Sequence, residues 1–165
     1  MKNQLNQDGL PRDTLLTNIK SALLRRREEN TGLGIQTKDN VFDSRLLAIY
    51  GEEFLCGKLP GSTRSTSINE AAWDIRTADG KTVQVKSRAV YLHNVDAIHI
   101  DFKENLNFDF LFLLLVDEGL KHLCTSLIRK ERLAPLLFQN KKGGFRMRDI
   151  RRRYLEYQAL SEDAF

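Results

Sequence analysis

The stretch WDIRTADGKTVQVKSR, residues 73–88, carries the clearest structural pattern in this chain. It predicts two short strands joined by a tight turn, because the dipeptide Asp79-Gly80 is a turn signal and the VQV segment after it alternates apolar and polar residues. A three-residue loop at residues 78–80 would place Gly80 in the left-handed conformation, which glycine adopts at low cost. The stretch therefore predicts a β-hairpin.

The length of this loop decides which side chains of the hairpin meet. A three-residue loop places Thr77 opposite Lys81 and therefore Asp74 opposite Gln84. Lys86 shares a face of its strand with Gln84, because side chains two residues apart point to the same side. A carboxylate, an amide and an ammonium group would then converge. A two-residue loop would move Asp74 to the other face, and the pattern alone leaves both registers open.

Such a triplet has a chemical use. Asp74 can supply an oxygen ligand to a divalent cation, and the side chain of Gln84 or the carbonyl of Val85 can supply further ones. Lys86 can orient a water molecule or stabilise negative charge on a phosphate that is being attacked. The alternative interpretation is an exposed hairpin with ordinary polar residues on its solvent face.

These residues resemble the PD-(D/E)XK nuclease superfamily, which has the restriction-endonuclease-like fold. The resemblance is carried by Asp74, by the QVKS segment at residues 84–87, and by Gly51-Glu52-Glu53 on a preceding predicted helix. Members of that superfamily have an acidic residue on a helix, an Asp that opens one strand, and an (E/Q)xK triplet on the next strand. The resemblance covers roughly residues 41–128.

Two positions depart from the pattern of that superfamily. Trp73 stands where the superfamily name has Pro, and Gln84 replaces the acidic residue of the triplet, which removes a charge from the expected metal site. Glu52 and Glu53 cannot both face the hairpin, and the superfamily's Gly-Glu order favours Glu52.

The resemblance implies a metal-dependent endonuclease that hydrolyses DNA phosphodiesters, with Mg²⁺ as cofactor and Mn²⁺ as a substitute. It implies metal ligation by Asp74, Gln84, Val85 and Glu52, and catalytic roles for Asp74, Gln84, Lys86 and Glu52. Because Gln84 is neutral, we expect weak metal binding in the absence of nucleic acid. If the protein cuts both strands of DNA, the simplest arrangement is a homodimer.

Composition sets broad bounds. A length of 165 residues suits one domain over residues 1–165, with residues 1–11 as a loose tail. The net charge of +4 favours DNA as an acidic partner and leaves RNA open. Cys56 and Cys124 lie far apart without metal-ligand spacing, which predicts buried free thiols. The polar N-terminus and the short apolar run at residues 110–116 predict no membrane segment and a soluble, intracellular, cytoplasmic protein. The resemblance to the PD-(D/E)XK nucleases implies a prokaryotic or phage origin.

The remaining pattern predicts an α/β fold with a central mixed sheet of about four or five strands and helices on both sides. The expected helices cover residues 11–29, a segment from Asp39 or Asn40 to about residue 57, and residues 128–138 and 147–160. The expected strands beyond the hairpin cover residues 97–102, 108–116 and 121–127, and the near-continuous apolar run at 108–116 predicts a strand buried on both faces. Residues 57–69 and 141–144 are expected as a loop and a turn.

Basic and hydroxyl residues are the candidates for nucleic-acid contact. They are Arg64, Ser65, Ser87, Arg88, Lys141, Lys142, Arg148, Arg151 and Arg152. The arginines at the start of the last predicted helix oppose the helix dipole, which favours a role in binding, whereas the Arg25–Arg27 triplet at a helix C-terminus is explained equally well by that dipole. Two other interpretations stay open: a non-catalytic nucleic-acid-binding module, and a regulatory protein whose basic surface meets an acidic protein.

Overall fold

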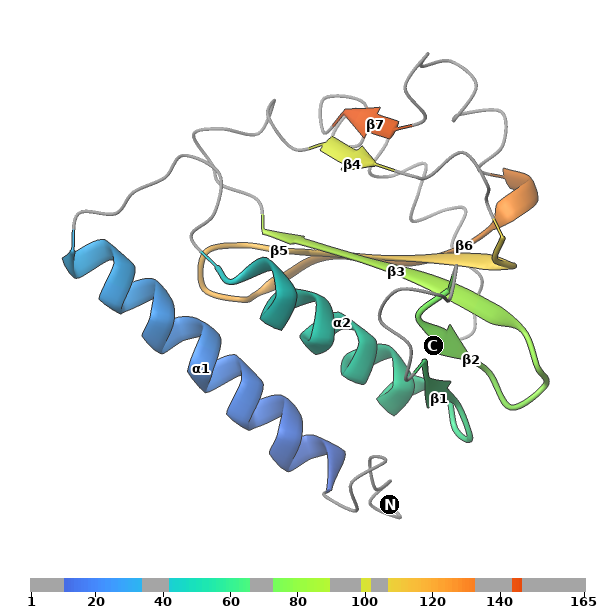
Figure 1. Ribbon diagram of the computed structural model, residues 1–165, viewed down its shortest axis with the longest axis horizontal. Coiled ribbons are helices and arrows are strands. Elements are labelled where there is room, and N and C mark those ends of the chain that lie inside the picture. The colour runs from blue at the N-terminus through green and yellow to red at the C-terminus, as the bar shows by residue number, and fades with distance from the viewer. Residues whose placement is uncertain are drawn as a thin grey trace.

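The computed structural model describes residues 11–33, 42–65, 73–89, 99–101, 107–132 and 144–146. Along the chain, the elements are α1 (Arg12–Gly32), α2 (Ser44–Lys58), β1 (Thr63–Arg64), β2 (Ile75–Arg76), β3 (Thr82–Ala89), β4 (His99–Asp101), β5 (Phe110–Val116), β6 (His122–Arg129) and β7 (Gly144–Arg146). Figure 1 shows that α1 and α2 lie on the same side of the main sheet.

The main sheet has five strands in the order β1-β2-β3-β5-β6. Strands β3 and β5 are parallel, whereas β1, β2 and β6 each run antiparallel to a neighbour. The predicted α/β class with a mixed sheet is therefore confirmed, but α1 and α2 lie on one side of this sheet rather than on both sides. Strands β4 and β7 pair with each other as a separate antiparallel sheet. The helix expected on residues 147–160 lies outside the described residues.

The hairpin between β2 and β3 has the register that a three-residue loop predicts. Ile75 pairs with Val83, and the Thr77 N–H donates to the Lys81 carbonyl at 2.8 Å. Gly80 has a φ of +83°, the left-handed conformation in which an L side chain is strained. The open choice between two loop lengths is therefore resolved in favour of the longer loop.

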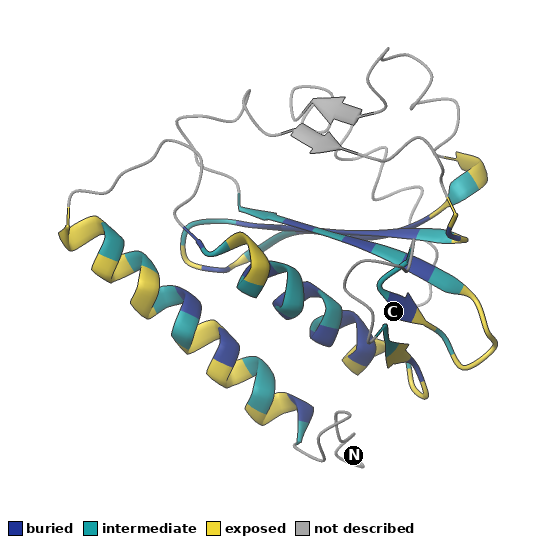
Figure 2. Ribbon diagram, in the orientation of Figure 1, coloured by how far each residue is buried: buried dark blue, intermediate teal, exposed yellow. Residues whose placement is uncertain are grey.

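The core forms around β5, which is buried on both of its faces. Phe112, Leu114 and Val116 belong to the cluster that also contains residues of α1 and α2. Leu111 and Leu113, which alternate with them, are buried as well. This burial confirms the expectation from the near-continuous apolar run. Figure 2 shows the same pattern, with buried residues through the middle strands and exposed residues along one side of α1.

Helix α2 begins later than the sequence pattern predicts. Its N-cap is Asp43, whose carboxylate accepts from the backbone N–H groups of Arg45 and Leu46, both at 3.0 Å. The expected cap at Asp39 or Asn40 is therefore wrong. All of these residue types can cap a helix, and the local pattern did not distinguish among them.

Helix α2 approaches β3 very closely at Gly51. A Cβ atom on Gly51 would lie 1.9 Å from Ser87 Oγ and 3.3 Å from Val85 Cγ1. The absence of a side chain at Gly51 therefore permits this close packing. The contact matters for the site, because Gly51 precedes Glu52 on the helix and Ser87 follows Lys86 on the strand.

Three other boundaries differ from the prediction. Thr63–Arg64 forms strand β1 inside the expected loop, because β2 offers it an edge to pair with. Strand β6 runs to Arg129, so residues 128 and 129 do not begin a helix, and among the described residues of this segment 130–132 are helical. Gly144 is the first residue of β7 rather than part of a turn. Each difference reflects strand pairing with a partner distant in sequence.

The Arg25–Arg27 triplet has intramolecular partners. Arg26 forms an ion pair with Asp43, and Arg27 donates to the carbonyl of Glu118 at 2.6 Å and pairs with its carboxylate at 3.2 Å. Arg25 Nε lies 4.0 Å from Glu29 Oε1. Two of these arginines therefore tie α1 to the start of α2 and to the β5–β6 turn.

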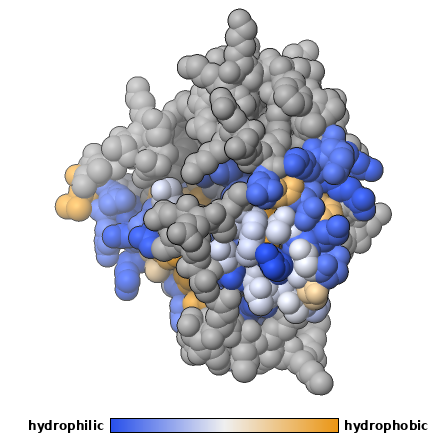
Figure 3. Space-filling model, turned by 45° about the vertical axis from the view of Figure 1, so that its right-hand side comes forward, coloured by the Kyte–Doolittle hydropathy of each residue, from blue (hydrophilic) through white to orange (hydrophobic). Residues whose placement is uncertain are grey.

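The described surface and core fit two further expectations. Cys56 and Cys124 are buried free thiols, as predicted. On the face shown in Figure 3 the described residues are mostly hydrophilic, with small and separate apolar areas. Among the described residues, no helix is long and apolar enough to cross a membrane.

Candidate functional site

Asp74 directly precedes β2 and lies beside β3. Its N–H donates to the Val83 carbonyl at 2.9 Å, and its own carbonyl accepts from Ser65 N–H at 2.7 Å. Its carboxylate atom Oδ2 accepts from Val85 N–H at 2.6 Å and from the Gln84 amide. The contact between Asp74 and Gln84 that the three-residue loop predicts is therefore confirmed. The Val85 N–H donates to the Asp74 carboxylate instead of to a backbone carbonyl of a neighbouring strand.

The carbonyl of Val85 shares this edge of β3. The N–H and C=O groups of one residue in a strand point to the same side, and the Val85 N–H points to Asp74. The side chain of Val85 is buried, so this residue offers the site only its main chain. The Asp74 carboxylate and the Val85 carbonyl therefore lie at the same edge of β3.

Lys86 is half-buried on the same strand, and its positive charge acts on Asp74. Burial raises the pKa of the Asp74 carboxyl, while the Val85 N–H, Lys86 and Arg64 each act to lower it. The net direction is upward. The ionised form of Asp74 is therefore less stable than it would be in water, and an additional positive charge near it would be favourable.

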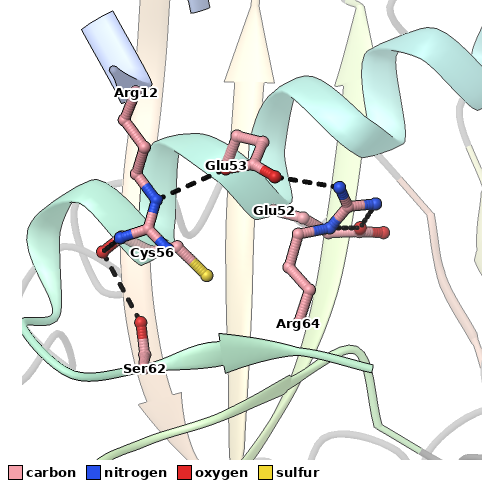
Figure 4. A network of polar contacts seen from close by, with 6 residues as sticks. All are labelled: Arg12, Glu52, Glu53, Cys56, Ser62 and Arg64. Atoms are coloured by element: carbon pink, nitrogen blue, oxygen red, sulfur yellow. Dashed lines mark hydrogen bonds and ion pairs between the residues drawn. The ribbon is translucent and has the colours of Figure 1, made fainter. Parts of the chain in front are cut away.

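A network of charged groups connects α2 to β1 and α1 (Figure 4). Arg64 Nε and Nη2 both lie 2.8 Å from Glu52 Oε2, and Arg64 Nη1 lies 2.9 Å from Glu53 Oε1. Arg12 Nε lies 3.4 Å from the other oxygen of Glu53, and Arg12 Nη1 donates to the Cys56 carbonyl at 3.0 Å. Both glutamates are therefore bound by arginine.

The two glutamates differ in environment. Glu53 is 3% exposed and lies between two guanidinium groups, so it is a structural ion-pair residue rather than a surface carboxylate. Glu52 is half-buried, and its pKa is raised by burial first, with Asp74 adding to the rise and Arg64 opposing it. The influence of Asp74 puts Glu52, the residue that the Gly-Glu order favours, within electrostatic reach of the hairpin.

Asp74 and the main chain of Val85 could hold one Mg²⁺ ion. In proteins Mg²⁺ is commonly held by one or two carboxylates together with water and substrate phosphates. Asp74 and the Val85 carbonyl provide such a set, and the raised pKa of Asp74 shows that a nearby cation would relieve a cost. Among the described residues there is no group of three or more His, Cys, Asp or Glu side chains that could hold a metal ion.

Two of the expected ligands are otherwise engaged. Gln84 presents its amide nitrogen, not its oxygen, to Asp74, so it would have to turn its amide over to become a ligand. That rotation is about a torsion with a broad, roughly two-fold profile. Glu52 has one oxygen bound twice by Arg64. In this arrangement Gln84 orients Asp74, and Glu52 is an ion-pair partner.

The expected nucleic-acid contacts are placed in different ways. Ser87 is 2% exposed beneath Gly51, so its hydroxyl is not available to a phosphate, and that expectation is corrected. Arg88 is half-buried and donates to the Ser87 carbonyl at 2.9 Å. Arg64 and Ser65 lie next to the Asp74 hairpin. The remaining expected contacts, Lys141, Lys142, Arg148, Arg151 and Arg152, lie outside the described residues.

Sequence reasoning missed the partners of Arg64 and the role of Arg12. Arg64 is separated from Glu52 by 12 positions, and Arg12 from the Cys56 carbonyl by 44. Helical or strand periodicity carries no signal at such separations. The sequence offered only the pair Glu52-Glu53, which point to different sides of a helix, and it did not show that either glutamate is buried and therefore requires a partner.

The comparisons with known proteins do not assign the chain to a family. The sequence matches no protein-family model and no curated protein. The functional argument therefore depends on the geometry of Asp74, Lys86 and their neighbours.

Proposed function

We propose that this protein is a metal-dependent endonuclease that hydrolyses DNA phosphodiesters. The observation that carries the proposal is the position of Asp74, which holds one oxygen against the β3 edge at Val85 while Lys86 acts on it electrostatically. The same residues carry the resemblance to the PD-(D/E)XK nucleases. A partly buried carboxylate with a raised pKa beside a lysine on a strand edge is a candidate functional group.

Each residue has a distinct role in this proposal. Asp74 and the Val85 carbonyl hold Mg²⁺ or Mn²⁺, and Gln84 fixes the carboxylate of Asp74 in place. When bound, the cation would supply charge stabilisation to the phosphate and acidify a water molecule. Lys86 would bring an ammonium group to the phosphate oxygens as their negative charge grows, and would orient the attacking water.

The negative phosphates of a DNA substrate would complement the bound cation and the basic residues near the site. The net charge of +4 favours a polyanion, and Mg²⁺ sites of this kind take ligands from substrate phosphates. Arg88 and Ser65 would position the backbone, and the basic residues outside the described ranges would extend the contact. Cutting both strands would require two active sites, which we propose are provided by a homodimer.

One observation favours a second candidate, a non-catalytic DNA-binding module. Glu52 is bound by Arg64 and Gln84 presents its nitrogen to Asp74, so two of four expected ligands are not offered to a cation. A protein that had lost turnover could keep such an arrangement. It would still bind DNA through its basic residues, with a steep dependence on salt because phosphate neutralisation releases counterions.

The deciding experiment measures cleavage of supercoiled plasmid DNA with Mg²⁺, Mn²⁺ or EDTA. We expect the wild-type protein to cut only with metal. Asp74→Asn keeps an acceptor for Val85 N–H but removes the charge, so cleavage should be lost while the fold remains. Lys86→Ala should lower the rate by about 10²–10³-fold, the typical cost of one charge-stabilising donor.

Matched variants on the same hairpin provide the controls. Asp79→Asn removes an exposed carboxylate at the turn, and Lys81→Ala removes an exposed ammonium group beside it. Both should cut like the wild type. Absence of cleavage with every metal, with intact DNA binding by all five proteins, would reject the endonuclease and leave the binding module.

A further inference from the structure

Arg64 occupies the place beside Glu52 that a metal ion would need. Its Nε and Nη2 atoms both lie 2.8 Å from Glu52 Oε2, a separation typical of strong charge-assisted hydrogen bonds. Arg64 also lies close to Asp74, because β1 pairs with β2 and the Ser65 N–H donates to the Asp74 carbonyl at 2.7 Å. One guanidinium group therefore neutralises Glu52 beside the residue proposed to hold the metal.

The arrangement lets Arg64 leave Glu52 without leaving Glu53 isolated. Glu53 has a second cation, because Arg12 Nε lies 3.4 Å from its other oxygen. Among the described residues, Arg64 is the one cation within ion-pair distance of Glu52. If Arg64 moved away, Glu52 would keep no ion-pair partner among the described residues, and binding of a divalent cation would be favoured there.

Arg64 is also accessible. Its side chain is 27% exposed, compared with 10% for Arg12, and it belongs to a strand of two residues at the edge of the sheet. Guanidinium groups bind phosphate through paired hydrogen bonds as readily as they bind carboxylate. A phosphate of the nucleic-acid backbone near β1 can therefore compete with Glu52 for this side chain.

We propose that Arg64 is a positioning residue that pairs with Glu52 in the free protein and transfers to a substrate phosphate, which releases Glu52 to a divalent cation. The proposal rests on the proposed endonuclease function and adds its regulation. DNA binding and metal binding would then be coupled: the free protein binds metal weakly, and each of the two ligands raises the affinity for the other by the same factor.

The test measures Mn²⁺ affinity of the full chain, by electron paramagnetic resonance of the free ion, without any substrate. Arg64→Gln should tighten Mn²⁺ binding about tenfold or more, because hydrogen bonds to a charged group no longer hold Glu52. The double variant Glu52→Gln/Arg64→Gln should return the affinity to the wild-type value. Arg76→Gln, which removes an exposed arginine on the neighbouring strand, should have no effect.

A DNA duplex tests the coupling directly. In a Lys86→Ala background, which keeps the duplex intact, addition of mixed-sequence duplex should tighten Mn²⁺ binding when Arg64 is present. It should have little further effect in Arg64→Gln. If Arg64→Gln does not fold, Arg64→Lys serves instead, because one ammonium group cannot bind both glutamates and should give a smaller gain in the same direction.

The outcomes separate this proposal from the proposed function. Unchanged or weaker Mn²⁺ binding in the Arg64 variants overturns the role of Arg64, even if wild-type protein cuts DNA. A gain that persists without Glu52 also overturns it, since loss of a nearby positive charge then explains the effect. A gain that requires Glu52 supports it, and supports it equally if plasmid cleavage is never observed, in which case only the endonuclease is rejected.

Discussion

Substitution of Gly51 by Ala tests the contact that positions the site. Gly51 packs α2 against β3, and the added Cβ would lie 1.9 Å from Ser87 Oγ, far inside the closest approach that real Cβ atoms make. The helix must move or Ser87 must be displaced. Since the neighbouring residues are Glu52 and Lys86, either response also disturbs the proposed site.

The expected magnitude follows from two opposing effects. Overpacking of a well-packed interior costs typically about 1–3 kcal/mol, and an overlap of more than an ångström belongs at the upper end. Replacement of Gly by Ala inside a helix recovers about 1 kcal/mol of helix propensity. We therefore expect Gly51→Ala to lower the free energy of unfolding by about 2 kcal/mol, which corresponds to a decrease in Tm of about 4–8 °C in a domain of this size.

Urea denaturation of a double-mutant cycle measures the effect. Among the described residues Ser87 Oγ has no hydrogen-bond partner, so Ser87→Ala alone should be neutral or slightly stabilising. In the double variant Gly51→Ala/Ser87→Ala the 1.9 Å contact is absent, and the remaining distance between the two Cβ atoms is 3.3 Å. The double variant should therefore recover most of the roughly 2 kcal/mol of unfolding free energy that Gly51→Ala alone loses through overpacking.

Gly57 on the same helix provides the control. A Cβ atom there meets nothing within 4 Å, so Gly57→Ala should leave stability unchanged or raise it by up to about 1 kcal/mol. Equal effects of Gly51→Ala and Gly57→Ala would refute the argument, as would a double variant as unstable as Gly51→Ala.

Three further predictions concern stability. Gly80→Ala should cost about 1–2 kcal/mol in thermal unfolding because Gly80 has a φ of +83°, and an unchanged Tm would contradict the loop geometry. Asp43→Ala should cost about 1 kcal/mol through loss of the α2 cap, with Asp43→Ser restoring most of it; failure of Ser to restore it would assign the loss to the Arg26 ion pair instead. Burial, aided by nearby lysines, lowers the pKa of His122, so its contribution to stability is present above about pH 6.5 and is lost as the pH falls below that value. His122→Gln should therefore reduce the loss of unfolding free energy, measured with urea, as the pH falls below about 6.5. An unaltered pH dependence would exclude His122 as the cause of that loss.

The hairpin shows how far local pattern reaches in this protein. The Asp79-Gly80 turn and the alternation after it predicted both strands but left two registers open, and the structure has the register that brings Asp74 to Gln84. The prediction worked because a tight turn sets strand register within a few residues. The start of α2 was mispredicted, because several neighbouring residues can cap a helix and tertiary contacts decide among them.

The partners of the charged residues required the tertiary structure. Glu52 and Glu53 are adjacent in the sequence, and pattern alone could say only that they point to different sides of a helix. Their common partner, Arg64, reaches them because β1 pairs with the edge of β2. Which buried carboxylate receives which arginine depends on such a pairing, and so does whether Glu52 is open to a cation.

Sequence alone was therefore sufficient for the α/β class, the central hairpin, the strand buried on both faces and the free cysteines, since each depends on short-range periodicity, turn chemistry or residue spacing. The fold decided that Ser87 is buried beneath Gly51, that Gln84 turns its nitrogen to Asp74, and that Arg64 neutralises Glu52. These features depend on distances between segments that are remote along the chain. Packing and charge compensation in three dimensions set those distances.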